Sequence, residues 1–188
     1  MTPMLGNDTG SVLTANSPAV PSIVRDALKG FHTVTCLPVQ WGEQDAFGHV
    51  NNVTYFRWLE SARIDLLNAC PSSVSMSASG LGPILASIQC DYRRQLRFPD
   101  TVWIGSRVAR VGRSSVELEH VVVSESQGVA AASGKCVIVV FDYTTQRVSR
   151  IPDDLRTAFE RSLAIAAAQA SATITAEMQS EQGNDGSR

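Results

Sequence analysis

The first regular pattern of hydrophobic positions begins just after Gly30. Residues 31–41 are rich in Val, Thr and aromatic side chains, a composition that predicts a β-strand. Pro38 within this run predicts an edge position or a bulge, because proline cannot donate a hydrogen bond to a neighbouring strand. The polar residues 42–51 that follow are expected to form a loop.

Apolar residues then recur at helical spacing and predict a helix over 52–69. Asn51 or Asn52 can cap this helix by accepting a hydrogen bond from a free first-turn N–H. Pro71 ends it, because the residue before a proline avoids the helical conformation. The apolar side chains lie on most sides of this helix, which is typical of a helix that is buried on more than one face.

Strand-like patterns dominate the rest of the chain up to a last amphipathic helix, which is predicted over 152–168. An antiparallel meander is the arrangement expected of four consecutive strands, and the overall order is typical of an α+β fold. One curved sheet cannot cover a helix that is apolar nearly all round, so a second copy of the chain is expected to complete the burial. The four predicted strands are 84–94, 101–111, 114–124 and 129–143.

Both ends of the chain have the composition of flexible tails. Residues 1–24 are rich in Ser, Thr, Pro, Gly and Asn, and residues 169–188 are polar and end in a Gly-rich run. We therefore expect one folded domain over 25–168. The length of 188 residues and a hydrophobic content of 44% agree with a single packed domain.

Charge and targeting features exclude several classes of protein. The formal net charge is −2, with no basic stripe of the kind that nucleic-acid-binding proteins carry. Residues 1–22 contain no Lys or Arg and no apolar run, so no signal peptide is expected. No stretch approaches the roughly 18 consecutive apolar residues of a membrane span. We expect a cytoplasmic protein without a nucleic-acid or membrane partner.

Metal and disulfide chemistry also have little support. Cys36, Cys70, Cys90 and Cys136 form no C-x-x-C pair and lie in apolar or strand-like surroundings, so we expect reduced, packed thiols. The three His residues lie far apart in the sequence, so no metal site is expected. The signatures of serine hydrolases and of phosphate-binding or dinucleotide-binding loops are absent.

The most informative stretch joins the loop to the start of the helix. It resembles the hotdog-fold thioesterases of the 4-hydroxybenzoyl-CoA thioesterase type, through an Asp, then Gly-His-Val-Asn-Asn, then Tyr, then Glu-x-x-Arg. The resemblance implies a hotdog fold, in which a curved antiparallel sheet wraps around a central helix. It also implies hydrolysis of acyl-CoA by a homodimer or homotetramer without a cofactor. The matching residues are Asp45, Gly48, His49, Val50, Asn51, Asn52, Tyr55, Glu60 and Arg63.

The chemistry of thioester hydrolysis suits these residue types. A loop carboxylate such as Asp45 can act as nucleophile or as general base toward a thioester carbonyl. The free N–H groups and the positive dipole end of the following helix can stabilise the developing oxyanion. Gly48 permits a tight turn and a close approach of the backbone to the substrate.

The neighbouring motif residues each have a structural and a functional interpretation. His49 is either a packed histidine or a site residue. Asn51 and Asn52 are most simply helix caps, and one of them could also orient Asp45 or the attacking water. Some relatives carry a His or Tyr where this chain has Asn52, which argues against a second catalytic group there. Tyr55 is most simply a core residue with a bonded hydroxyl.

Charged residues further along the chain have two interpretations as well. Glu60 and Arg63 are three residues apart on the helix and can pair, although Glu60 could instead face the site. Arg113, in a tight turn after a glycine, is the first choice for a contact to the CoA phosphates, followed by Arg110 and Lys135. Each of these three cations is most simply an ordinary solvated charge.

Two other functions remain open on the sequence. One is a hotdog-fold enoyl-CoA hydratase or dehydratase, because that chemistry also uses an Asp and a His near this helix. The other is a non-catalytic module that binds acyl-CoA or acyl-carrier protein. Free-thiol release from a panel of acyl-CoA substrates, with enoyl-CoA hydration measured in parallel, separates all three.

Overall fold

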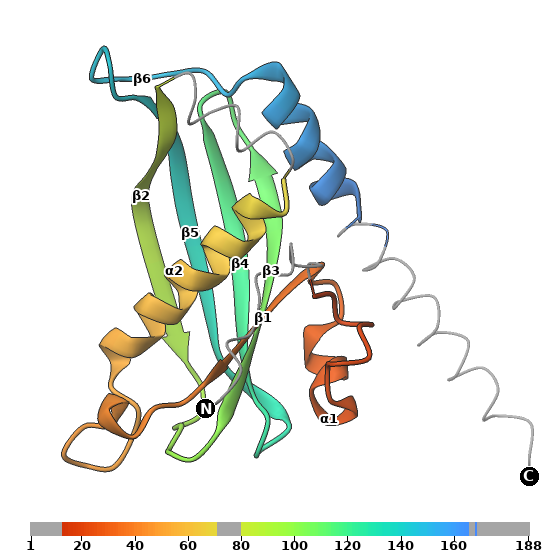
Figure 1. Cartoon of the computed structure of the whole chain (residues 1–188), viewed down its shortest axis with the longest axis vertical. Coiled ribbons are helices and arrows are strands. Elements are labelled where there is room, and N and C mark those ends of the chain that lie inside the picture. The colour runs from red at the N-terminus through yellow and green to blue at the C-terminus, as the bar shows by residue number, and fades with distance from the viewer. Residues whose placement is uncertain (1–12, 71–79, 166–167, 169–188) are drawn as a thin grey trace, which may run out of the picture.

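The structure is a computed structural model that describes residues 13–70, 80–165 and 168. It consists of a curved antiparallel sheet with a long helix across one face (Figure 1). This confirms the predicted α+β fold. Residues 1–12 of the predicted N-terminal tail, the predicted C-terminal tail 169–188 and the loop 71–79 lie outside the described residues. The elements are α1 (Ser22–Arg25), β1 (Thr33–Pro38), α2 (Asn52–Asn68), β2 (Leu81–Tyr92), β3 (Thr101–Val111), β4 (Ser115–Ser124), β5 (Val129–Asp142) and β6 (Arg147–Val148), with short 3-10 turns at Asp26–Leu28 and Trp41–Glu43.

The strand order corrects one prediction. The strands lie in the order β1-β3-β4-β5-β2, with β6 beside β5, so β2 pairs with β5 and not with β3. The second edge of β3 is occupied by β1, whose Thr33 to Pro38 pair with Ser106 to Thr101. The connection 93–100 therefore carries the chain from one edge strand toward the other. The predicted meander holds only for β3, β4 and β5.

Strand β1 bears out the interpretation of Pro38. It is an edge strand that ends at Pro38, and Trp41–Glu43 already forms a 3-10 turn, so the strand is shorter than the predicted 31–41. The hydrogen bond from Val39 N to Asp100 O, 2.9 Å long, fastens the chain to the start of β3 just before the loop. The loop thus leaves the sheet from a fixed point.

Helix α2 packs one face on the sheet and leaves the other open. Asn51 caps it, because its side chain accepts a hydrogen bond of 3.0 Å from Val53 N. Leu59 is fully buried and rests on Gly134 of β5, where a Cβ atom would lie 2.7 Å from Leu59 Cδ1. On the outer face, Val53 is 60% exposed and Ile64 is 48% exposed. A single chain therefore does not bury the apolar residues of this helix on every side.

The N-terminal boundary of the domain also needs correction. Residues 13–24, which the sequence assigns to a tail, are described and pack on the sheet face opposite α2. Val20 and Val24 are buried there against Trp103 and Val121. Ser, Thr and Pro residues separate the widely spaced apolar positions in this segment, so its sequence shows no regular hydrophobic pattern. The folded unit begins at residue 13 or earlier.

The C-terminal helix covers the far end of the core. Residues 153–165 are helical and bury Leu155 and Phe159 in the cluster that contains the last turns of α2. Arg156 Nη2 donates a hydrogen bond of 2.6 Å to Gly112 O, which ties this helix to the turn between β3 and β4. The helix predicted over 152–168 is therefore confirmed over 153–165, and residues 166–167 lie outside the described residues.

A polar cluster lies buried between α2 and the sheet. His120 Nδ1 lies 2.8 Å from Ser106 Oγ, and its Nε2 lies 3.5 Å from Cys136 Sγ. Burial, and after it the nearby charge of Arg63, lower the pKa of His120 to about 4, while Glu119 opposes the shift. His120 is therefore neutral in the folded protein near neutral pH.

This cluster makes stability depend on pH. The pKa of His120 in the folded chain, about 4, lies below the unfolded value of about 6.5. The unfolded chain therefore binds the proton first, so stability is lost as pH falls from about 6.5 to 4, by about 3 kcal/mol. His120→Gln should remove this contribution and flatten the dependence, as measured by urea denaturation at pH 7, 6 and 5. Equal pH slopes for the variant and the wild type would contradict the assignment.

Candidate active site

The loop before α2 folds around Asp45. Asp45 Oδ1 accepts hydrogen bonds from Phe47 N at 2.8 Å and from His49 N at 3.3 Å. Asp45 N donates to His49 O at 2.8 Å, and Gly48 N donates to Asp45 O at 3.0 Å. Gly48 has φ 72°, a left-handed conformation that a residue with a side chain adopts only with strain, which explains the glycine in the motif.

These bonds orient the carboxylate without occupying it fully. Asp45 is exposed, and among the described residues its Oδ2 has no hydrogen-bond partner. One oxygen therefore fixes the side chain on the loop backbone, while the other is available to a water molecule or a substrate. This is the arrangement that a nucleophile or a general base requires.

A hollow of about 470 Å³ opens beside this carboxylate. It lies where the loop, the start of α2 and the end of β2 meet, and it brings together four of the residues that the sequence predicts for the site. The remaining lining comes mostly from the end of β2 and the residues after it. The lining residues are Asp45, His49, Val50, Asn52, Tyr55, Tyr92, Arg93, Arg94 and Gln95.

The first turn of α2 supplies a hydrogen-bond donor to this hollow. The Asn51 side chain binds Val53 N, and Asn51 O accepts a bond of 2.9 Å from Thr54 N. Within the described residues the Asn52 N–H has no such partner. Asn52 lines the hollow at the positive end of the helix dipole, so its N–H suits a developing negative charge.

Aromatic rings form one wall of the hollow. Tyr92 packs edge-on against Tyr55, with ring centroids 5.0 Å apart, and its hydroxyl donates to Asn52 O at 3.2 Å. Tyr55 also contacts Trp58 at 5.1 Å and is buried, as predicted. Burial raises the pKa of the Tyr55 hydroxyl, so this group stays protonated and does not serve as a base.

His49 is held by an arginine from the connection between β2 and β3. Arg97 Nη2 lies 2.9 Å from His49 Nε2. An arginine side chain only donates hydrogen bonds, so His49 Nε2 is the acceptor in this contact. The backbone N–H of Phe98 donates to Gln44 Oε1 at 3.1 Å and fastens the same connection to the loop.

Glu60 lies apart from this group of residues. It is on α2 eight residues after Asn52, which is about 12 Å along the helix, and it is not part of the hollow's lining. Its Oε1 lies 3.5 Å from Arg63 Nη2, so the predicted ion pair is present. In this chain Glu60 has a structural contact and no place beside Asp45.

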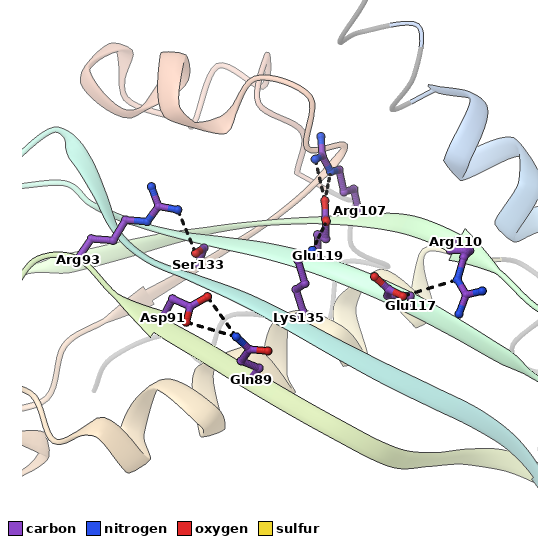
Figure 2. Close-up of polar contacts among 9 residues, drawn as sticks. All are labelled: Gln89, Asp91, Arg93, Arg107, Arg110, Glu117, Glu119, Ser133 and Lys135. Carbon is purple, nitrogen blue, oxygen red and sulfur yellow. Dashed lines mark hydrogen bonds and ion pairs between the residues drawn. The ribbon is translucent and has the colours of Figure 1, made fainter.

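The three cations predicted to hold phosphate lie elsewhere too. Arg113 follows β3 at the end opposite Thr101, so a strand of about 33 Å separates it from the loop side of the sheet. Arg110 pairs with Glu117 at 3.7 Å. Lys135 pairs with Glu119 at 3.2 Å on the outer face of the sheet (Figure 2). Within one chain these cations do not converge on Asp45, and their role toward CoA stays a prediction.

Sequence reasoning missed the contribution of the segment after β2. Tyr92, Arg93, Arg94 and Gln95 line the hollow, and Arg97 holds His49. A signal was present, since three arginines occur within five residues at the end of the predicted strand 84–94 and just beyond it. Only the pairing of β2 with β5 and the path of the connection bring that run to the loop.

The described residues contain neither a metal-binding cluster nor a membrane-spanning helix. Among them, no cluster of three or more His, Cys, Asp or Glu side chains could hold a metal ion. No helix within the described ranges is long and apolar enough to cross a membrane.

Comparison with known proteins agrees with this geometry. The family model of the thioesterase-like superfamily matches residues 39–159. This range includes the loop, α2 and the strands beside the hollow. The chain belongs to the thioesterase-like superfamily. Membership makes this protein an enzyme of the thioesterase type and confirms the resemblance noted in the sequence.

Several thioesterases are similar over most of the domain. The long-chain acyl-CoA thioesterase FadM of Escherichia coli is 29% identical over 127 residues, covering 68% of this chain and 96% of FadM. The crystal structure of YbaW, a probable thioesterase from Escherichia coli, has a TM-score of 0.64 at 29% identity and covers 70% of this chain and 99% of YbaW. The gentisyl-coenzyme A thioesterase BH1999 has a TM-score of 0.60 at 27% identity, with 68% and 99% covered.

Proposed function

We propose that this thioesterase hydrolyses acyl-CoA to a free acid and CoA, with Asp45 as nucleophile or general base. The observation that carries the proposal is a carboxylate with one unoccupied oxygen, in the same hollow as the Asn52 N–H at the start of α2. FadM and the gentisyl-coenzyme A thioesterase, which are similar over most of the domain, support CoA as the carrier.

Two courses of reaction fit the site. As general base, Asp45 takes a proton from water, the resulting hydroxide adds to the carbonyl carbon, and the carbon–sulfur bond breaks as the thiolate gains a proton. As nucleophile, an Asp45 oxygen displaces the CoA thiolate and forms an anhydride, which water then cleaves to regenerate the carboxylate. Both courses consume one water and yield one acid and one thiol.

Both courses also pass through an oxyanion on the carbonyl oxygen. The Asn52 N–H is the first-turn donor without a partner among the described residues, and it lines the same hollow as Asp45. A single donor of this kind is typically worth about 2.7–4 kcal/mol of the activation barrier. The Tyr92 hydroxyl donates to Asn52 O, in the next peptide unit, and helps to hold the first turn of α2 in place.

The proposed function is tested with a panel of acyl-CoA thioesters that differ in chain length and in aromatic content. Release of free thiol is followed with a chromogenic disulfide, and hydration of an enoyl-CoA is measured in parallel. We expect thiol release from at least one acyl-CoA and no hydration. Hydration without thiol release would favour a hydratase, and binding of acyl-CoA without either reaction would favour a binding module.

We also propose that the thioesterase works as a homodimer or homotetramer. Strand β2 pairs with β5 on one side only, and across its other edge no strand of the described residues lies. Leu85 on this strand is an exposed apolar residue, as are Val53 and Ile64 on the outer face of α2. Burying such surface is worth about 25 cal/mol per Å², which favours association.

Light scattering coupled to size-exclusion chromatography measures the oligomeric state. At micromolar concentration we expect a mass of two or four chains. Leu85→Lys, which places a charge on the open strand, should shift the population toward smaller species, whereas Arg147→Gln on β6, which pairs with the edge of β5 away from β2, should not. A wild-type protein that stays monomeric and active would contradict the proposal.

A further inference from the structure

The arginines directly after β2 form a cationic group at the rim of the candidate active site. Arg93, Arg94 and Arg97 are all exposed, and within the described residues none pairs with a carboxylate. Arg97 contacts the His49 side chain. Arg93 and Arg94 line the hollow, and within the described residues neither has a charged partner. Unpaired cations beside a reacting carboxylate indicate an anionic part of the substrate.

Arg93 connects this hollow with the outer face of the sheet. Its Nη2 reaches Ser133 Oγ on β5, 3.4 Å away, and Ser133 lies on the face opposite α2 (Figure 2). Arg93 also lines a second hollow of about 310 Å³ on that face. A ligand whose thioester lies at Asp45 can therefore extend along the hollow, past Arg94, to the guanidinium group of Arg93.

Other cations of the outer face are already neutralised. Glu119 accepts hydrogen bonds from Arg107 at 3.0 and 2.7 Å and lies 3.2 Å from Lys135. These contacts lower the pKa of Glu119, although burial acts in the opposite direction, so it remains a carboxylate that offsets both charges. An anion gains less from Arg107 or Lys135 than from the unpaired Arg93 and Arg94.

We propose that Arg93 and Arg94 bind the phosphate at the far end of the substrate's pantetheine arm. This inference rests on the proposed function, because it places the thioester at Asp45. The arm has about the length of four extended residues, roughly 14 Å, so the phosphate must bind away from the reacting carbon. CoA and acyl-carrier protein share this phosphate, and arginine offers it two parallel donors.

The test compares Arg93→Gln/Arg94→Gln with the wild type on one acyl group carried by CoA, by acyl-carrier protein and by pantetheine without phosphate. For acyl-CoA at low salt we expect KM to rise at least about tenfold with kcat nearly unchanged. KM for acyl-pantetheine should not change. Arg147→Gln, an exposed arginine on the distant β6, controls for the loss of charge and should behave as the wild type.

The carrier-protein substrate identifies the source of the phosphate. A rise in KM for both phosphate-bearing substrates supports the contact to the shared phosphate. A rise for acyl-CoA alone overturns it, because the arginines would then contact the nucleotide end of CoA. A rise for the carrier protein alone overturns the proposal, because the arginines would then contact the protein surface. The proposal is also overturned if KM for acyl-CoA is unchanged, or if Arg113→Ala raises it and the double variant does not.

Binding of free CoA separates this inference from the proposed function. Calorimetry measures CoA affinity for the wild type and the double variant without any hydrolysis. If no thioester is hydrolysed, the proposed function fails, and the calorimetry still decides the phosphate site. Weaker, salt-sensitive binding by the double variant supports the site, and equal binding overturns it.

Discussion

Asp45→Asn should lower kcat for acyl-CoA hydrolysis by three orders of magnitude or more, while the fold remains intact. The asparagine side chain keeps an oxygen that can accept the bonds from Phe47 N and His49 N, so the loop retains its shape. The amide is neither a nucleophile nor a base, so both proposed courses of reaction lose their first step. Steady-state kinetics and thermal melts of both proteins measure the two effects.

A second aspartate serves as the control. Asp153 is exposed on the C-terminal helix, far from the hollow, and its contact to Arg150 is long at 3.9 Å. Asp153→Asn should therefore retain both activity and stability. If Asp45→Asn keeps a rate near that of the wild type with an unchanged melting curve, Asp45 is not the reacting carboxylate.

Gly134→Ala should destabilise the protein by about 1–3 kcal/mol although it adds a single methyl group. The new Cβ would lie 2.7 Å from Leu59 Cδ1 and 3.2 Å from Leu59 Cδ2, in the closest contact between α2 and the sheet. Leu59 is fully buried and has no free space to move into. Urea denaturation at a fixed protein concentration measures the loss, because association also contributes to stability.

A double-mutant cycle shows whether this contact is the cause. Leu59→Ala alone should cost about 2–5 kcal/mol by leaving a cavity between helix and sheet. In that background the methyl group of Gly134→Ala no longer clashes, so it should cost little or partly fill the cavity. Additive losses would contradict the view that Leu59 and Gly134 set the distance between α2 and β5.

Short-range sequence patterns were sufficient to predict the local conformation of the loop that carries Asp45. Asp45, Gly48 and Asn51 act through bonds to residues within four positions, and such bonds follow from residue type and spacing. The edge position of β1 likewise followed from Pro38, because a missing N–H is a local property. The Asn51 cap, the tight turn at Gly48 and the edge position of β1 are confirmed because each follows from a local property of the residue, while the catalytic role of Asp45 stays a prediction.

The hydrophobic pattern of the sequence could not predict which strands pair when they lie far apart in the chain. The place of β2 beside β5 depends on β1 occupying the edge of β3, and a hydrophobic pattern does not specify which edge a strand takes. The missed contribution of Arg93 and Arg94 has the same cause, since they reach Asp45 only through that placement. Val20 and Val24 were assigned to a tail because their partners on β3 and β4 are about 80 to 100 residues away.

Product analysis in H₂¹⁸O tests the central claim most directly. The wild type and Asp45→Asn are incubated with the acyl-CoA that reacts fastest, and free CoA, free acid and the ¹⁸O content of the acid are measured together. For the wild type we predict equal amounts of CoA and acid, with solvent oxygen in the carboxyl group, and for Asp45→Asn almost no product. Release of CoA without labelled acid, or no release from any acyl-CoA by the wild type, would contradict thioester hydrolysis at Asp45.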